Sequence, residues 1–351
     1  MPEALLLSKA FSQSLQPSKI YPYFYRATTS FDQDDITVIT LITRNRLKVF
    51  RELVLNYDGP ISVTVHINDE PQEVQDFLQD LHQLQLSTPR MYQLVDVHVV
   101  LDSFDRQFNT WRNIARFFAR TDYVMMLDVD FFVCTDFRSA IRASAPVMKM
   151  LAEGRSAFVI PAFEYTAAQD QSPPLDTFPR DKQSLVKAVN EEQIGMFHAS
   201  WPVGHNSTDY SRYYNASEGE VYKVTQYQAS YEPYVVFKKT DPPWCDERFV
   251  GYGGNKAACL FEMYLSGVSY YVLSDHFLIH QGHPYEETAR KNERKMNRKL
   301  YQDFKLETCL RYIKAYHESG ILNSTVGFNL QQECKKIGGL SKTMYQMIKD
   351  D

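Results

Sequence analysis

The chain has 351 residues and a formal net charge of −5, with 44% hydrophobic and 23% charged residues. These values are ordinary for a soluble globular protein and provide enough apolar residues for a full core. A nucleic-acid partner is not expected, because such proteins usually carry an overall basic bias. The one local basic run, from Arg290 to Lys299, has helical spacing, and we interpret it as a solvated helix face.

The cysteines and glycosylation sequons bear on the compartment. The five cysteines include no CxxC pair, so a zinc site is not expected, and Cys309 and Cys334 could form a disulfide. Sequons at Asn206, Asn215 and Asn323 fit a secretory-pathway protein. The chain shows no basic leader and no apolar stretch of about 18 residues, so no membrane anchor is visible and a cytoplasmic location stays open.

The first half of the chain alternates strands with helices. The first 35 residues lack strong periodicity, so we predict an N-terminal lead-in over 1–35, and the β-branched run at 36–43 then predicts a buried strand. Further strands are predicted at 61–66, 95–101, 123–127 and 157–162, and helices at 47–54, 74–84 and 109–120. This alternation predicts a single α/β domain, over 36–285, with a mostly parallel mixed sheet flanked by helices.

The second half is less regular. Residues 166–230 are polar with few long apolar runs, which favours a binding region over a linker. Strands are again predicted at 234–237 and 270–273, and a helix near 254–266. The remainder, 286–351, is predicted to be a C-terminal helical extension packed on the domain.

Two carboxylates, Asp128 and Asp130, follow the apolar strand at 123–127. The carboxyl edge of a parallel sheet is where ligands bind in such folds, and residues i and i+2 of a strand face the same way. Both carboxylates are therefore candidates to hold one hard cation and the diphosphate that it carries. A helix N-cap, a salt-bridged turn or chance would give the same tripeptide, so the motif alone does not decide.

The helix before this strand carries a polar stripe. Asn109, Arg112, Asn113 and Arg116 recur at helical spacing, opposite an apolar face. Arginine can fork onto anionic oxygens and asparagine can satisfy sugar hydroxyls, so the stripe is a candidate sugar or phosphate contact. A solvated helix face is the alternative.

Two further segments carry candidate chemistry. An apolar strand at 277–279 ends in His280, which with two aspartates would make a mixed oxygen–nitrogen site that suits Mn²⁺ better than Ca²⁺. Asp246 and Glu247 precede a glycine-rich turn and a helix, where a buried carboxylate can act as a general base. A structural ion pair between Asp246 and Arg248 is the alternative.

Other candidate substrate contacts are predicted in loops. Trp201 offers an aromatic platform for an acceptor sugar, with Gly204 and His205 close behind it. Thr43, directly after the first strand, and Gly253, in the glycine-rich turn, complete the candidate substrate-binding residues.

Several of these segments, taken in order, resemble the LARGE-type glucuronyltransferase family, which includes the β-1,4-glucuronyltransferase of the dystroglycan pathway. The segments that carry the resemblance are 58–63, 112–115, 121–130, 159–164, 204–205, 231–236, 246–253 and His280. The resemblance extends from about Ile20 to Phe304. It implies a GT-A fold, Mn²⁺, a UDP-sugar donor, a glycan acceptor and inversion at the anomeric carbon.

The resemblance also implies roles for particular residues. Asp128, Asp130 and His280 would hold the metal, and Arg112 and Asn113 would contact the donor.

The catalytic base would lie at Asp246, with Glu247 as its rival.

Gly254 stands where relatives carry a bulky aromatic residue, and Gln281 stands where some carry lysine. The donor sugar, for which glucuronic acid is the best match, is therefore open to alternatives such as xylose.

Two other functions compete with this interpretation. A catalytically silent, glycan-binding relative is disfavoured by the intact acidic and histidine positions. A nucleotidyltransferase would normally show a glycine- and lysine-rich loop after the first strand, and residues 43–47 contain no glycine. The resemblance and the sequons together suggest the Golgi lumen; the oligomeric state is open.

Overall fold

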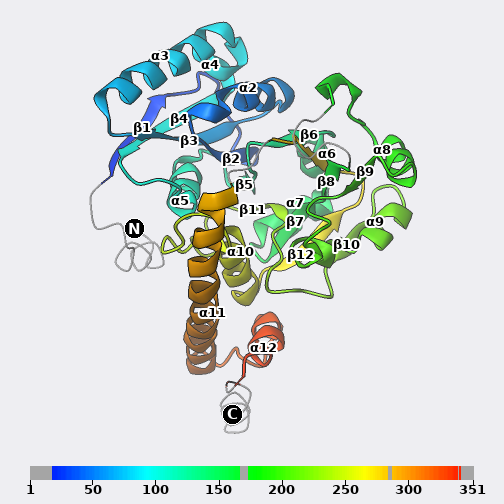
Figure 1. Cartoon of the computed structure of the whole chain (residues 1–351). Helices are drawn as coiled ribbons and strands as arrows, with labels where there is room; N and C mark the ends of the chain where they lie inside the picture. Colours follow the sequence, from blue (N-terminus) through cyan, green and yellow to red (C-terminus); the bar gives the residue numbers. More distant parts are fainter. Residues whose placement is uncertain (1–17, 167–172, 284–286, 339, 341–351) are drawn as a thin grey trace.

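The computed structural model describes residues 18–166, 173–283, 287–338 and 340 (Figure 1). Nine strands within these residues form the larger sheet. They are β1 (Lys19–Tyr25), β2 (Ile36–Ile42), β3 (Ile61–Asn68), β4 (Val95–Asp102), β5 (Tyr123–Met126), β7 (Ser156–Ile160), β10 (Val221–Lys223), β11 (Tyr234–Lys238) and β12 (Ser269–Leu273). Their spatial order is β1-β4-β3-β2-β5-β11-β7-β12-β10.

The larger sheet is mixed. Strands β4, β3, β2 and β5 run parallel, as does the pair β7 and β12. Strand β11 lies between these two parallel groups and is antiparallel to both β5 and β7. Strand β1 adds an antiparallel edge beside β4 and lies inside the range predicted as a lead-in. Its side chains are mostly exposed, which explains why hydrophobic periodicity did not reveal it.

Helices cover both faces of the parallel strands (Figure 1), which confirms the predicted α/β class. The helices of this half are α2 (Leu47–Asn56), α3 (Pro71–Ser87), α4 (Pro89–Leu94) and α5 (Phe108–Phe118). Along β3, Val63 and Val65 belong to the apolar cluster that includes α3, whereas Ser62 and Thr64 donate hydrogen bonds to carbonyls of α5. Alternation along β3 therefore lets the strand bury both of its faces.

A second, smaller sheet positions part of the site. Its strands are β6 (Phe131–Val133), β8 (Ala162–Tyr165), β9 (Ile194–Met196) and β13 (Leu278–His280), in the order β6-β13-β8-β9. The helices of this half are α6 (Phe137–Ala143), α7 (Ala145–Ala152), α8 (Lys182–Asn190) and α9 (Tyr210–Asn215). Helix α8 contacts β9, whereas α7 contacts β7 and β11 of the larger sheet. The sequence of 166–230 showed no regular hydrophobic pattern. The described part of this range consists of short helices and strands, and such elements are too short for a hydrophobic repeat to be recognised.

Three helices complete the fold: α10 (Asn255–Leu265), α11 (Glu287–Glu318) and α12 (Phe328–Cys334). The helix α11 extends away from the sheets with α12 beside its far end (Figure 1). A disulfide between Cys309 and Cys334 joins these two helices, as the sequence allowed, and a second, Cys245–Cys259, ties α10 to the loop before it. None of the described helices has the length and apolar character needed to cross a bilayer.

Candidate active site

The tripeptide Asp128-Val129-Asp130 lies in a turn between the two sheets. Strand β5 ends at Met126, and the amide of Phe131 donates to the carbonyl of Asp128 at 3.2 Å. The premise that both carboxylates belong to one strand therefore does not hold. A turn directs neighbouring side chains differently, and the two aspartates have different partners.

Asp130 belongs to a cluster with two histidines. Strand β13 pairs antiparallel with β6, which sets His280 opposite Phe131, and the amide of Gln281 donates to the carbonyl of Asp130 at 2.8 Å. Within the described part of the chain, one ligand atom from each of Asp130, His280 and His283 lies within 4.8 Å of the others. A carboxylate and two imidazoles form a mixed oxygen–nitrogen set that suits a transition metal better than Ca²⁺.

The protonation of His280 favours metal binding. Burial lowers the pKa of His280 to about 3, even though the nearby carboxylate of Asp130 acts to raise it. The imidazole is therefore neutral near pH 7 and offers a lone pair, which is the form that binds metals.

A guanidinium lies against the same cluster. Nε of Arg46 lies 3.0 Å from Oδ1 of Asp130, and a terminal nitrogen of Arg46 lies 3.1 Å from Nδ1 of His283. Nε2 of His283 is 3.3 Å from the other oxygen of Asp130. Arg46 thus contacts two of the three groups that a metal would use.

Asp128 faces a different environment, dominated by cations. Its Oδ2 accepts hydrogen bonds from Nζ of Lys256 at 2.9 Å and from the hydroxyl of Tyr234 at 3.0 Å, and its Oδ1 accepts from Arg112 at 3.2 Å. The side chains of Lys256 and Arg112 are 6% and 8% exposed, against 33% for Asp128. Two buried cations therefore share one partly exposed carboxylate.

This pairing stabilises the ionised form of Asp128. Burial acts to raise its pKa, but Lys256 and then Arg112 outweigh burial and hold the pKa well below its usual range. Tyr234 connects to the same group through a hydrogen bond from Nζ of Lys256 to its hydroxyl at 2.8 Å. The two cations carry one charge more than Asp128, and burial raises the pKa of the neighbouring Glu232, which disfavours its charged form; this side of the turn therefore favours an additional anion.

The polar stripe of α5 is buried, so the alternative of a solvated face is wrong. Asn109 donates to the carbonyls of Asp246 and Asn255, and Asn113 exchanges hydrogen bonds with the backbone of Cys245. Arg116 donates to carbonyls in the segment 239–243. Most of the stripe therefore holds the loop before α10.

Within this stripe, Arg112 alone reaches the turn of Asp128. Its other terminal nitrogen donates to the side-chain oxygens of Asn109 and Asn255, at 3.0 and 2.7 Å. These hydrogen bonds restrain the orientation of the Arg112 guanidinium. The predicted donor contacts of Arg112 and Asn113 remain predictions.

The two candidate bases are held by neighbours. Both oxygens of Asp246 accept hydrogen bonds from the side chain of Arg248, the shortest at 2.6 Å. This is the structural ion pair that the sequence left as an alternative. Glu247 is buried, and its Oε1 accepts from Asn113 at 3.0 Å.

The glycine-rich turn is shaped by α11. Gly253 has a φ of +96°, and a Cβ there would lie 3.2 Å from the backbone of Arg294. Asn297 donates to the carbonyls of Val250 and Tyr252 at 2.9 Å each. Part of the basic run at 290–299 thus packs on this turn, so the run is more than a solvated face.

The loop candidates fall into two environments. Trp201 is 46% exposed, whereas His205 is buried, and burial lowers its pKa well below the usual value. A Cβ on Gly204 would lie 2.5 Å from the ring of Trp201, so the glycine lets that ring pack on the backbone. Thr43 precedes the short helix of Arg46, and its hydroxyl donates to Asn45.

Sequence reasoning did not select four residues that complete this region: Arg46, Tyr234, Lys256 and His283. The spacing His280-x-x-His283 was a usable signal for the last of them. The partly exposed residue Glu232 is a further case, because desolvation of its carboxyl raises its pKa and it interacts electrostatically with Lys256 and Asp128. It lies in the resemblance segment 231–236 but was given no role.

An α/β fold with a metal-type cluster beside a pair of buried cations describes a candidate group-transfer enzyme. A family model described as "Glycosyl-transferase for dystroglycan" matches residues 35–107 and 102–313. The chain belongs to this family of glycosyltransferases, so the prediction of an enzyme of this class is confirmed at the level of its family.

Named relatives agree with this result. The chain is 34% identical over 253 residues to the xylosyl- and glucuronyltransferase LARGE2 of Mus musculus, a match that covers 71% of this chain and 34% of the relative. It is 27% identical over 315 residues to LARGE1 of Danio rerio, with coverage of 88% and 39%. The chain thus spans about a third of the length of the curated relatives it matches.

A more distant likeness exists among solved structures. GalNAc-T7, solved with UDP, GalNAc and Mn²⁺, superposes with a TM-score of 0.46 at 10% identity, covering 90% of this chain and 57% of the other. At this similarity the likeness says nothing about a shared ligand.

Proposed function

We propose that the chain is a Mn²⁺-dependent, inverting glycosyltransferase of the GT-A type. It would transfer a sugar, with glucuronic acid as the best candidate, from a UDP-sugar to a hydroxyl of a glycan acceptor. The observation that carries the proposal is the turn 128–130, which has a metal-type cluster on one side and two buried cations on the other. A divalent metal and an anionic diphosphate are what these two sides would attract.

The residues present fit the metal. Asp130, His280 and His283 would hold it, and Asp128 stays a proposed ligand beside them. The bound metal would neutralise the charge that grows on the diphosphate leaving group. Lys256 is positioned to add positive charge at the same leaving group, because its Nζ already pairs with Asp128.

The transfer itself would be a single displacement. A carboxylate, for which we propose Asp246 with Glu247 as rival, would remove the proton of the acceptor hydroxyl as its oxygen attacks the anomeric carbon. The bond from that carbon to the diphosphate would break on the opposite face, which inverts the configuration. The pair of Asp246 and Arg248 must loosen for this carboxylate to reach the hydroxyl.

The same proposal covers the surroundings of the site. Trp201, exposed beside Gly204, would carry the acceptor sugar. Two disulfides and exposed asparagines in the sequons support an oxidising, secretory compartment such as the Golgi lumen. Residues 36–285 would form the catalytic domain, with 286–351 as its helical extension.

One binding experiment tests the core of the proposal. UDP with Mn²⁺ should raise the melting temperature well above that with UDP alone, because the metal links the nucleotide to the cluster. A screen of UDP-sugars for Mn²⁺-dependent hydrolysis would identify the donor and separate glucuronic acid from xylose. No stabilisation by any UDP-sugar with Mn²⁺ would contradict the proposal.

Two substitutions test the roles of the carboxylates. If Asp128→Ala retains full Mn²⁺-dependent transfer, its assignment as a ligand is wrong. Asp246→Asn should bind UDP normally yet transfer at least about 100-fold more slowly. Transfer at the wild-type rate would move the base to Glu247, whose Gln variant is the matched test.

A further inference from the structure

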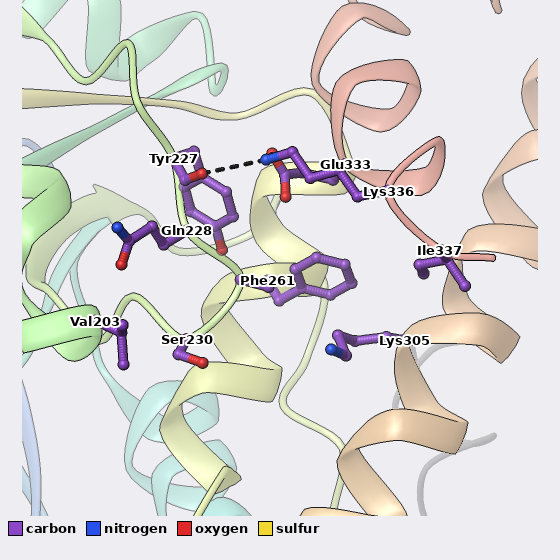
Figure 2. A pocket seen from close by; sticks show the side chains of 10 residues that line it. Val203, Tyr227, Gln228, Ser230, Phe261, Lys305, Glu333, Lys336 and Ile337 are labelled. Carbon is purple, nitrogen blue, oxygen red and sulfur yellow. Dashed lines mark hydrogen bonds and ion pairs between the residues drawn. The ribbon is translucent and has the colours of Figure 1, made fainter. Parts of the chain in front are cut away.

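A cavity of about 370 Å³ lies between α10, α11, the end of α12 and the loop before β11 (Figure 2). It is separate from the turn 128–130, and none of the roles described above uses it. Its wall residues are Val203, Tyr227, Gln228, Ala229, Ser230, Phe261, Lys305, Glu333, Lys336 and Ile337. Its volume falls in the range of small-ligand sites.

We propose that this cavity binds an acidic sugar of the acceptor glycan, at a distance from the sugar that is extended. The proposal rests on the function proposed above and specifies its acceptor: a glycan that carries carboxylates. Three features of the cavity support it: its place relative to the site, its chemistry and the way its far wall is built.

The cavity adjoins the acceptor side of the site. Val203 directly precedes Gly204, whose carbonyl accepts a hydrogen bond from the amide of Glu232 at 2.8 Å. Phe261 follows Lys256 by five residues on α10, which is about 7.5 Å along a helix. A glycan that reached the site past Trp201 would therefore meet the cavity within a few sugar units.

The chemistry of the walls suits a charged sugar. Gln228 and Ser230, on the loop before β11, offer an amide and a hydroxyl, and Phe261, which is 1% exposed, lines the cavity from α10 (Figure 2). Sugars are recognised by this combination of polar groups and flat apolar faces.

The charge balance selects an anion. Glu333 is neutralised by Lys336, whose Nζ lies 2.6 Å from its carboxylate and 3.4 Å from the carbonyl of Tyr227. Lys305 lies with its Nζ 5.2 Å from the ring centre of Tyr301, makes no close ion pair among the described residues, and interacts with Glu333 only through its longer-range charge. The cavity thus holds one cation in excess, which a carboxylate of the ligand would pair with.

The far wall is specific to the C-terminal part of this chain. The match to the family model ends at residue 313, whereas Glu333 lies in the last turn of α12 and Lys336 and Ile337 directly follow that helix. The disulfide of Cys309 and Cys334 fixes α12 against α11 and so holds this wall in place. A wall built beyond the match to the family model suits a role in acceptor choice rather than in the chemistry of the family.

Direct binding tests the proposal. The probe is a tetrasaccharide of alternating glucuronic acid and neutral amino sugar, titrated calorimetrically beside its carboxyl-reduced analogue. The wild type should bind the acidic form about fivefold to tenfold more tightly than the reduced form. Lys305→Ala should lose that preference, and Lys305→Arg should keep most of it.

Two further variants make the result specific. Gln228→Trp, at an exposed position, should fill the cavity and weaken both probes. Lys314→Ala, on an exposed part of α11, is the matched control and should bind as the wild type does. Equal binding of the two probes by the wild type, no binding at millimolar concentrations, or an unchanged preference in Lys305→Ala would overturn the proposal.

Thermal stabilisation of the same proteins by UDP and Mn²⁺ distinguishes a failure of this inference from a failure of the proposed function on which it rests. Stabilisation by UDP and Mn²⁺ should be unchanged in Lys305→Ala, because the cavity lies outside the donor site. If UDP and Mn²⁺ fail to stabilise the wild type while the acidic probe still binds, the proposed transfer fails and the glycan site stands.

Discussion

Asp128 and Asp130 stand two residues apart in one turn, yet each meets a different kind of partner. Asp130 lies with two histidines, and Asp128 lies between Lys256 and Arg112. The first side is built by β13 of the small sheet, and the second by α5 and α10 beside the large sheet. A short acidic motif therefore gains its chemistry from the elements that pack around it.

The contrast suggests a division of work across the turn. The histidine side offers a carboxylate and two imidazoles, a set that suits a metal, and the cationic side has two buried cations beside Asp128, which suit phosphate oxygens. If this division is correct, substitutions on the two sides should separate metal binding from nucleotide binding.

The largest effect is expected on the histidine side. Asp130→Ala and His280→Ala should each lower Mn²⁺-dependent transfer by at least about 100-fold, because a ligand to the metal is lost. His283→Ala should do the same if it is a ligand. Mn²⁺ binding followed by calorimetry checks each variant, with His82→Ala, on an exposed face of α3, as control.

The outcome for His283 is the most informative. Unchanged Mn²⁺ affinity in His283→Ala, with loss in His280→Ala, would favour the set of Asp128, Asp130 and His280 that the resemblance implied. The division of the turn would then have to be abandoned.

The next effect is expected on the cationic side. Lys256→Met should weaken UDP binding about tenfold or more, because a buried ammonium that can meet phosphate oxygens is removed. Mn²⁺ binding without nucleotide should stay within about twofold of the wild type. Lys187→Met, on a solvated helix, provides the control.

A fall in metal affinity in Lys256→Met would mean that the two sides act as one site. The same titration therefore tests both the role of the lysine and the proposed division.

The sequence predicted the acidic turn but could not predict its partners. The strand at 234–237 was recognised, but its direction was not, since an apolar run is the same read in either direction. In the structure β11 runs antiparallel to β5 and sets Val235 opposite Met126, which brings Tyr234 beside Asp128. Pairing between strands that are far apart in the chain leaves no periodic signal in the sequence.

Other misses have physical reasons of the same sort. Lys256 looked like an ordinary helix residue, because its burial depends on α10 packing against α5. Nothing in the sequence indicated that Asn109 and Asn113 satisfy backbone groups of a buried loop, although the predicted donor contact of Asn113 stays a prediction. Polar residues at helical spacing predict which face of a helix is polar, but they do not predict which part of the chain packs against that face.

A smaller effect is expected from the residue that touches both parts of the histidine side. The guanidinium of Arg46 contacts Asp130 and His283, so it repels a metal that approaches them. Arg46→Gln should raise the Mn²⁺ affinity of the nucleotide-free protein about threefold. Arg44→Gln, whose guanidinium pairs with exposed carboxylates of α3, should leave it unchanged. A weaker Mn²⁺ affinity in Arg46→Gln would show that the arginine supports the cluster.

The smallest effect concerns stability and pH on the cationic side. The pKa of Asp128 lies below its unfolded value of about 3.9, so its pairing contributes stability that is fully present above about pH 4. That stability is lost as the pH falls through the lower folded pKa. Asp128→Asn should therefore lower the melting temperature by about 2–4 °C at every pH from 8 to 5.

Below pH 4 the difference between wild type and Asp128→Asn should shrink, because the carboxylate of the unfolded wild type then takes up a proton while that of the folded protein is still ionised. Asp58→Asn removes a carboxylate whose side chain is 88% exposed and should show almost no difference at any pH. A melting-temperature difference for Asp128→Asn that changes between pH 8 and 5 would point to another titrating group in the turn. The cationic side would then not be the fixed positive pocket on which nucleotide binding is proposed to depend.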